Sequence, residues 1–151
     1  MSNELMNPMV GEIKNILETV RSRVSKIVND ELIISYWKIG EIIVRYEQND
    51  SIRATYGEQT LKQLSKELTK AFGKGFSRSN LQNMRALYLA YPKCQSLTGK
   101  LSWTHYCELL GISDLDKRSF YEKEAINSNW SVRELKRQIN TSLYEDRKSV
   151  V

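Results

Sequence analysis

Residues 58–91 read EQTLKQLSKELTKAFGKGFSRSNLQNMRALYLAY and contain two helical patterns joined by a short glycine-rich turn. Apolar residues of the first pattern recur every three to four positions, which predicts a helix from about Gly57 to Phe72. Its expected inward residues are Leu61, Leu64, Leu68 and Phe72. Similar spacing recurs along nearly the whole chain, and the alternation of period two that marks strands is absent. The sequence therefore predicts an all-α fold.

Two glycines shape the predicted turn. Gly73 suits the left-handed position that follows a helix, and Gly75 permits a second sharp change of direction. Ser77 is the predicted N-cap of the next helix, which extends to about Tyr91, where Pro92 helps to stop it. Helix, short turn and capped helix form the layout of a helix-turn-helix unit, whose second helix enters the major groove of DNA.

The second helix of this unit has two different faces. At about 100° per residue, Leu81, Met84 and Tyr88 form an apolar side. The other side is polar, and because amide and guanidinium groups pair with base edges, we assign base reading to Arg78, Ser79, Gln82 and Asn83. Phosphate contacts are assigned to basic residues and the helix cap: Lys62, Lys66, Lys70, Lys74, Ser77 and Arg85. The plainer alternative is a solvated helix face beside a flexible turn.

The positive charge of the chain is concentrated in the same region. The 151 residues include 23 Lys+Arg and 18 Asp+Glu, which gives a net charge of +5. Residues 58–100 contain eight basic and two acidic groups, residues 1–57 contain seven and eight, and residues 101–151 contain eight of each. One basic block thus accounts for the whole imbalance, which predicts a single positive face suited to a polyanion, although random scatter of charge would produce the same count.

A long apolar pattern runs from about Val10 toward Tyr46. We assign five residues of its first part to a dimer or partner contact: Ile13, Leu17, Val20, Val24 and Ile27. Gly40 costs roughly 1 kcal/mol relative to alanine inside a helix, so either one helix of more than about 30 residues forms, or it breaks between Asn29 and Gly40. A helix that long needs a surface to pack on, which is either its own domain or a homodimer or separate nuclease chain.

The predicted boundaries leave one domain. We expect a disordered N-terminus at residues 1–9, a single all-α domain at residues 10–143 and a frayed tail at residues 144–151. A loop is expected at Asn49, Asp50 and Ser51.

Three shorter helices are predicted in the C-terminal third, with caps at Ser102, Asp114 and Ser131. Ser131 and Glu134 have the spacing of a capping box. Trp103 and Trp130 each adjoin a cap serine, and we expect them to seal helix starts against the core rather than to bind a ligand.

Sequence patterns of enzymes are weak in this chain. The metal-binding E-x-K of a PD-(D/E)xK nuclease needs β-strands, whereas Glu12–Lys14 and Glu134–Lys136 fall on predicted helices. His105 has no Cys or His partner nearby in sequence, which favours a core or capping role. Cys94 and Cys107 lack the spacing of a zinc site and are expected to be structural thiols. We therefore predict no catalytic residue, metal, cofactor or small-molecule substrate.

No apolar run approaches the roughly 20 residues of a membrane span, and residues 1–9 lack the layout of a signal peptide. The sequence thus predicts no membrane association and a cytoplasmic location.

Several of these motifs, in this order and spacing between about Ile13 and Tyr144, resemble the N-terminal domain of the bacterial YhcG-type proteins. They are Tyr36-Trp37-Lys38-Ile39-Gly40, Tyr56-Gly57, Phe72-Gly73-Lys74-Gly75-Phe76-Ser77, Asn80-Leu81-Gln82-Asn83-Met84-Arg85, Leu101-Ser102-Trp103-Thr104-His105 and Trp130-Ser131-Val132-Arg133-Glu134-Leu135. The resemblance implies a helix-turn-helix-like domain of unknown function that normally precedes a C-terminal PD-(D/E)xK nuclease domain. That second domain is absent here, so no catalytic residue transfers to this chain.

These observations favour a non-catalytic DNA-binding module that targets or assembles a nuclease. The alternative is a protein-interaction or dimerisation module that acts through the long N-terminal helix. An autonomous hydrolase is the least supported hypothesis, because no active-site pattern accompanies it.

Overall fold

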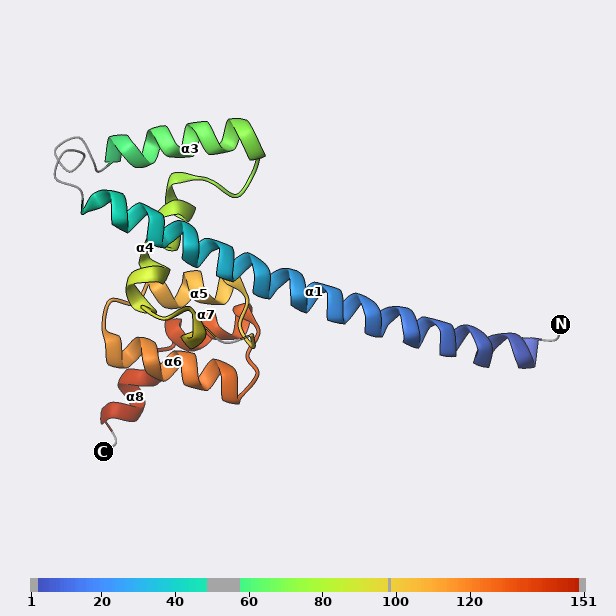
Figure 1. The fold of residues 1–151 in the computed structure, drawn as a ribbon. Helices are drawn as coiled ribbons and strands as arrows, with labels where there is room; N and C mark the ends of the chain where they lie inside the picture. The colour runs from blue at the N-terminus through green and yellow to red at the C-terminus, as the bar shows by residue number, and fades with distance from the viewer. Residues whose placement is uncertain (1–2, 49–57, 98, 150–151) are drawn as a thin grey trace.

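The structure, a computed structural model, describes residues 3–48, 58–97 and 99–149, and these residues form helices and connecting turns without a strand (Figure 1). The elements are α1 (Asn3–Glu47), α3 (Glu58–Phe72), α4 (Arg78–Ala90), a 3-10 turn η1 (Cys94–Ser96), α5 (Trp103–Leu110), α6 (Leu115–Asn127), α7 (Val132–Asn140) and α8 (Leu143–Ser149). The all-α prediction and the long N-terminal helix are confirmed. The loop expected at Asn49–Ser51 and the Tyr56-Gly57 motif lie outside the described residues.

Helix α1 is one unbroken helix of 45 residues, about 68 Å long at 1.5 Å per residue. It begins at Asn3 rather than at Val10, so the described part of residues 1–9, for which we expected disorder, is helical in the structure. Pro8 lies close to the start of the helix, where a missing N–H removes only one hydrogen bond. Figure 1 shows that the N-terminal half of α1 projects away from the other helices.

Gly40 explains why α1 does not break. A Cβ atom at this position would lie 2.1 Å from the backbone oxygen of Met84 in α4. The two helices therefore cross with their backbones in close contact, and only glycine leaves room for this approach. The packing gained at the crossing outweighs the helix propensity that glycine loses.

The helices other than the projecting half of α1 pack around one core, which we call the body. Its fully buried side chains come from α4, α5, α6 and α7 and from the segment before α5, and they include Leu81, Met84, Leu87, Leu101, Tyr106, Leu109, Tyr121 and Leu135. The C-terminal half of α1 contributes Ile33, Tyr36 and Ile43. Trp37 of α1 donates its indole N–H to the carbonyl oxygen of Tyr91 at 2.6 Å and so ties α1 to the end of α4.

The predicted caps of the short helices are all confirmed: Ser102, Asp114 and Ser131 accept hydrogen bonds from the first turns of α5, α6 and α7. The reciprocal capping box, however, forms at Ser102 and His105. The Ser102 N–H donates to Nδ1 of His105 at 3.1 Å, so the hydrogen of the neutral ring lies on Nε2. That Nε2–H donates to the carbonyl oxygen of Trp130 at 2.8 Å. His105 is thus a structural residue, as predicted.

The C-terminal segment differs from the frayed tail that the sequence predicts. Residues Leu143–Ser149 form α8, and Tyr144 packs on the core with its ring centroid 5.4 Å from that of Phe120. Ion pairs join α8 to α6 through Lys117–Glu145 and Arg147–Glu124. These contacts come from a distant part of the chain, which is why apolar periodicity within the tail does not reveal them.

Phe72 was predicted to face the core but is exposed in the structure. Leu61 is buried, and Leu64 and Leu68 pack against the core as expected, but Phe72 is 73% exposed. It lies at the last position of α3, where the chain turns away, and its ring contacts Phe76 of the turn at a centroid distance of 6.0 Å. The apolar pattern of the helix therefore extends one turn beyond its buried part.

Two carboxyl groups of the body should affect stability in opposite directions. Burial raises the pKa of Glu122 above its ordinary value, even though Arg118 and Lys123 attract the charged form. At about pH 7 the ionised group therefore destabilises the fold, and Glu122→Gln should raise the melting temperature. This gain should disappear as the pH falls below about 4.5, where the carboxyl is protonated in both the folded and the unfolded chain.

Glu134 is the matched control. Hydrogen bonds from Arg137 and Gln138 lower its pKa to about 2, so its contribution is present above the ordinary pKa of glutamate and is lost at lower pH. Glu134→Gln should lower the melting temperature slightly at neutral pH. Thermal unfolding followed by circular dichroism across this pH range tests both signs, and a Glu122→Gln variant less stable than the parent at neutral pH would contradict the prediction.

Candidate functional site

The turn between α3 and α4 has the predicted backbone. Gly73 and Gly75 have φ angles of +85° and +106°, the left-handed region that glycine adopts without strain. The Ser65 hydroxyl donates to the carbonyl oxygen of Phe76 at 2.6 Å and holds the turn against α3. Ser77 caps α4 by accepting the N–H of Asn80 at 3.1 Å. The helix–turn–capped helix prediction is therefore confirmed at the level of local structure.

Asn80 is a structural residue of this site for which we predicted no role. Its amide donates to the carbonyl oxygen of Gly75 at 2.5 Å, and its side-chain oxygen accepts the indole N–H of Trp103 at 2.9 Å. It thereby fixes the turn to α5 as well as to α4. The sequence signal is the Ser77-x-x-Asn80 spacing, which is that of a capping box with a shorter side chain at the last position.

The assigned base-reading residues divide into two groups. Arg78, Ser79 and Gln82 are exposed along the N-terminal half of α4, on the side away from buried Leu81 and Met84. Asn83 is instead half-buried and forms a hydrogen bond with the thiol of Cys107 in α5, a group whose pKa is raised to about 11 by burial. The difference arises because α5 packs on this flank of α4, which a helical wheel of α4 alone does not show.

The assigned phosphate contacts also divide. Lys62, Lys66 and Lys70 of α3 and Lys74 of the turn are exposed. Arg85, in contrast, forms an ion pair with Glu47 of α1, with 2.5 Å between Nε and Oε1. The Arg85 side chain is 40% exposed and that of Glu47 is 18% exposed, so the guanidinium is drawn toward α1.

Three of the exposed basic residues flank the connection between α3 and α4. Lys70 lies in the last turn of α3, Lys74 in the connection and Arg78 at the first position of α4. We call this group, together with Ser79 and Gln82, the α3–α4 corner, after the connection between the two helices that Figure 1 shows. The positive end of the α4 dipole lies at the same place, and no acidic residue occupies the first turn of α4. The corner thus combines cations, helix N–H groups and an amide, a set suited to an anionic polymer.

A second candidate site is the projecting part of α1, residues 3–28, which we call the stem. The five residues assigned to a partner contact, Ile13, Leu17, Val20, Val24 and Ile27, are between 48% and 62% exposed. Met6, Met9, Val10 and Ile16 are exposed as well. Soluble proteins rarely leave so long an apolar surface uncovered, so the stem has the character of an interaction surface.

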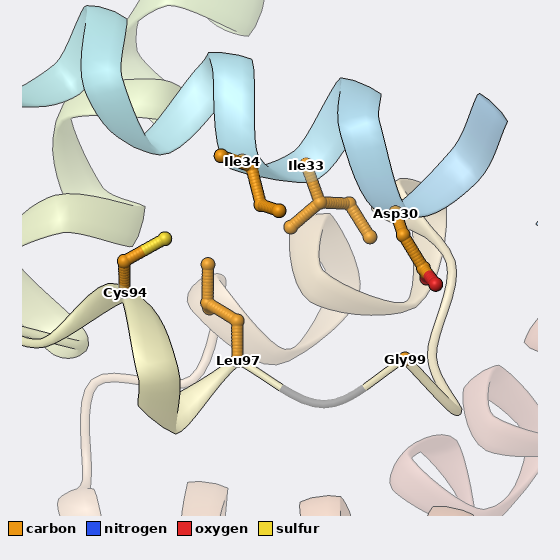
Figure 2. A pocket seen from close by; sticks show the side chains of 6 residues that line it. All are labelled: Asp30, Ile33, Ile34, Cys94, Leu97 and Gly99. Atoms are coloured by element: carbon orange, nitrogen blue, oxygen red, sulfur yellow. The ribbon is translucent and has the colours of Figure 1, made fainter. Parts of the chain in front are cut away.

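A small pocket of about 170 Å³ lies where the stem enters the body, between α1 and η1 (Figure 2). Its lining combines the apolar side chains of Ile33, Ile34 and Leu97 with Cys94, Asp30 and Gly99. Asp30 forms an ion pair with Lys26 at 3.0 Å. Among the described lining residues, the polar side chains are therefore the Asp30 carboxylate, which Lys26 neutralises, and the Cys94 thiol.

Metal-binding clusters and membrane-spanning helices can be assessed only for the residues that the structure describes. No group of three or more His, Cys, Asp or Glu side chains there could hold a metal ion. Nor does any described helix combine the length and apolarity that crossing a membrane requires.

Comparison with known proteins places the chain in a family. The model of the DUF1016 N-terminal domain matches residues 12–146. A protein of Escherichia coli (strain K12) named "Putative nuclease YhcG" shares 34% identity over 165 aligned residues, which cover 88% of this chain and 44% of that protein. The chain thus spans less than half the length of this relative. No solved structure matches significantly. By these two matches, the chain belongs to the DUF1016 N-terminal domain family.

Proposed function

We propose that this domain is a non-catalytic DNA-binding module that targets a nuclease. The observation that carries the proposal is the α3–α4 corner, where Arg78, Ser79 and Gln82 are exposed beside Lys70 and Lys74. Lysines and the start of α4 would contact phosphates, while the arginine and the amide would reach base edges. The nuclease link comes from the name of the relative, and nuclease activity would reside in sequence beyond this domain.

Two of the residues that we assigned to DNA contact have partners within the domain. Asn83 hydrogen-bonds to Cys107, and Arg85 is paired with Glu47, so both already have partners within the domain. Moving either one to DNA would leave a half-buried group with a lost interaction. Because their side chains are exposed, we propose Arg78, Ser79 and Gln82 for base reading and the exposed lysines for phosphate contact.

Salt dependence of duplex binding tests the phosphate contacts. Fluorescence anisotropy with a labelled duplex should show binding that weakens steeply as salt rises, because bound lysines release counterions. Lys66→Ala and Lys70→Ala should each reduce the slope of log K against log salt by about 0.9. Lys123→Ala removes an exposed lysine on α6, far from the corner in sequence, and should leave the slope unchanged. The absence of duplex binding at low salt would refute the proposed function.

The stem supports a second candidate function, protein interaction through α1. Its apolar residues are exposed over most of the projecting helix, and a lone helix of this composition gains little stability from its own contacts. Covering them with a partner would supply the packing that the body does not. This function is compatible with DNA binding, since the stem and the corner use different residues.

A further inference from the structure

We infer that the stem is one strand of a parallel coiled coil built from three or four copies of this chain. Seven apolar residues of the stem repeat with alternating spacings of four and three: Met6, Val10, Ile13, Leu17, Val20, Val24 and Ile27. This is an uninterrupted heptad pattern with Val10, Leu17 and Val24 at position a and the other four at position d. The next a position is Glu31, so the pattern ends where α1 reaches the body.

The heptad residues face away from the body. At about 100° per residue, Leu17 and Val24 lie on the side of α1 roughly opposite to buried Ile33, Tyr36 and Gly40. A partner helix could therefore lie along the whole stem without meeting the body of its own or the other chain. In a bundle whose stems contact one another through this face, the bodies would lie on the outside, around the bundle axis.

Charged residues that flank heptad positions a and d favour parallel strands. In a parallel coiled coil, a residue at position g lies near the e residue five positions later in the next strand. The pairs here are Met9 with Lys14, Ile16 with Arg21, and Arg23 with Val28, each joining one apolar residue to one cation. The cationic side chains can cover their apolar neighbours with their methylene groups.

An antiparallel pairing is less favourable. When the a and d residues are matched, with Val10 opposite Ile27 and Leu17 opposite Val20, e residues lie beside e residues. Lys14 then approaches Arg21 of the other strand, and symmetry repeats this like-charge contact. Such repulsion selects against the antiparallel arrangement.

The side chains at d indicate more than two strands. Ile13, Val20 and Ile27 at position d are β-branched, whereas parallel dimers prefer leucine at d. Val10 and Val24 at position a are β-branched as well, and β-branched residues at both a and d shift the preference to larger bundles. Met9 and Ile16 at position g widen the apolar face beyond the narrow seam of a dimer. Three or four strands would cover this wider face.

The consequence for DNA rests on the proposed function. Parallel strands place every body, and therefore every α3–α4 corner, at the same end of the assembly. Several corners on one particle would bind neighbouring segments of duplex with increased avidity.

Light scattering of the purified full chain in the absence of DNA tests the assembly. The expected particle mass is about three or four times the 17.6 kDa of one chain. Leu17→Asp/Val20→Asp should convert it to a monomer while the thermal transition of the body persists, because neither residue contacts the body. Ser22→Asp, at the outward position f, should retain the wild-type mass. A wild-type monomer or two-chain particle at micromolar concentration would overturn the inference.

Disulfide cross-linking tests the strand direction. In a Cys94→Ser/Cys107→Ser background, Val10→Cys should cross-link between chains on oxidation, because parallel strands bring equal positions together. If Val10→Cys fails to cross-link and Val10→Cys/Ile27→Cys succeeds, the strands are antiparallel and the inference is wrong. Both measurements omit DNA, so loss of the assembly and loss of DNA binding are distinguishable.

Discussion

Gly40→Ala should lower the free energy of unfolding by about 3 kcal/mol or more, because the new Cβ would lie 2.1 Å from the backbone oxygen of Met84 and 3.1 Å from Cβ of Tyr88. Neither neighbour is the flexible end of a side chain, so α1 and α4 would have to move apart. This crossing carries Trp37 and the Arg85–Glu47 pair as well. Chemical denaturation followed by circular dichroism, at one fixed chain concentration, measures the effect.

Gly11→Ala provides the matched control for helix propensity. Gly11 lies in the stem, and a Cβ atom there would have no atom within 4 Å. The same substitution should therefore leave stability unchanged or raise it by up to about 1 kcal/mol. Equal effects at the two positions would show that α1 and α4 do not cross closely at Gly40.

Arg78→Ala/Gln82→Ala should weaken binding to a duplex selected from a random pool by at least about 30-fold, since each base contact contributes about 1–3 kcal/mol of discrimination. Binding to unselected duplex should change much less, apart from the loss of one positive charge. Competition anisotropy with selected and unselected duplexes measures both quantities, and the ratio of the two affinities isolates base reading.

Gln95→Ala/Arg133→Ala removes the same two side-chain types from exposed positions of η1 and α7 and should leave the affinity ratio unchanged. Asn83→Ala should also preserve the ratio, because Asn83 bonds to Cys107 instead of facing solvent. If Asn83→Ala abolished discrimination while Arg78→Ala/Gln82→Ala did not, the assignment of α4 residues would have to be reversed.

Features that depend on a few neighbouring residues were predictable. Ser77, Ser102, Asp114 and Ser131 cap helices because a short side chain reaches the N–H groups two or three residues later, which is a local geometric requirement. Gly73 adopts the left-handed conformation for a similarly local reason. Helix spacing and the all-α class follow from periodicity along one chain segment.

Features that depend on distant residues were not predictable in the same way. Ser131 and Glu134 have capping-box spacing, yet the Glu134 carboxylate pairs with Arg137. The reciprocal capping box forms instead between Ser102 and His105, whose other ring nitrogen donates a hydrogen bond to the carbonyl oxygen of Trp130. Phe72 continues an apolar pattern but extends past the surface that α3 covers. The Trp130 carbonyl lies outside α5, and the surface that would cover Phe72 belongs to other elements, whereas the Glu134–Arg137 pair forms within α7.

The sequence by itself determined the helical class, the caps, the glycine turn and the concentration of charge in residues 58–100, since each is a property of local spacing or composition. Only the tertiary structure decided that Gly40 is a crossing point, that Asn83 and Arg85 face neighbouring helices, and that residues 3–28 extend beyond the body as a stem. The physical reason is that the exposure of a side chain and the partner it binds depend on which elements pack together in the fold. The sequence pattern of one helix does not specify which other helix packs against it.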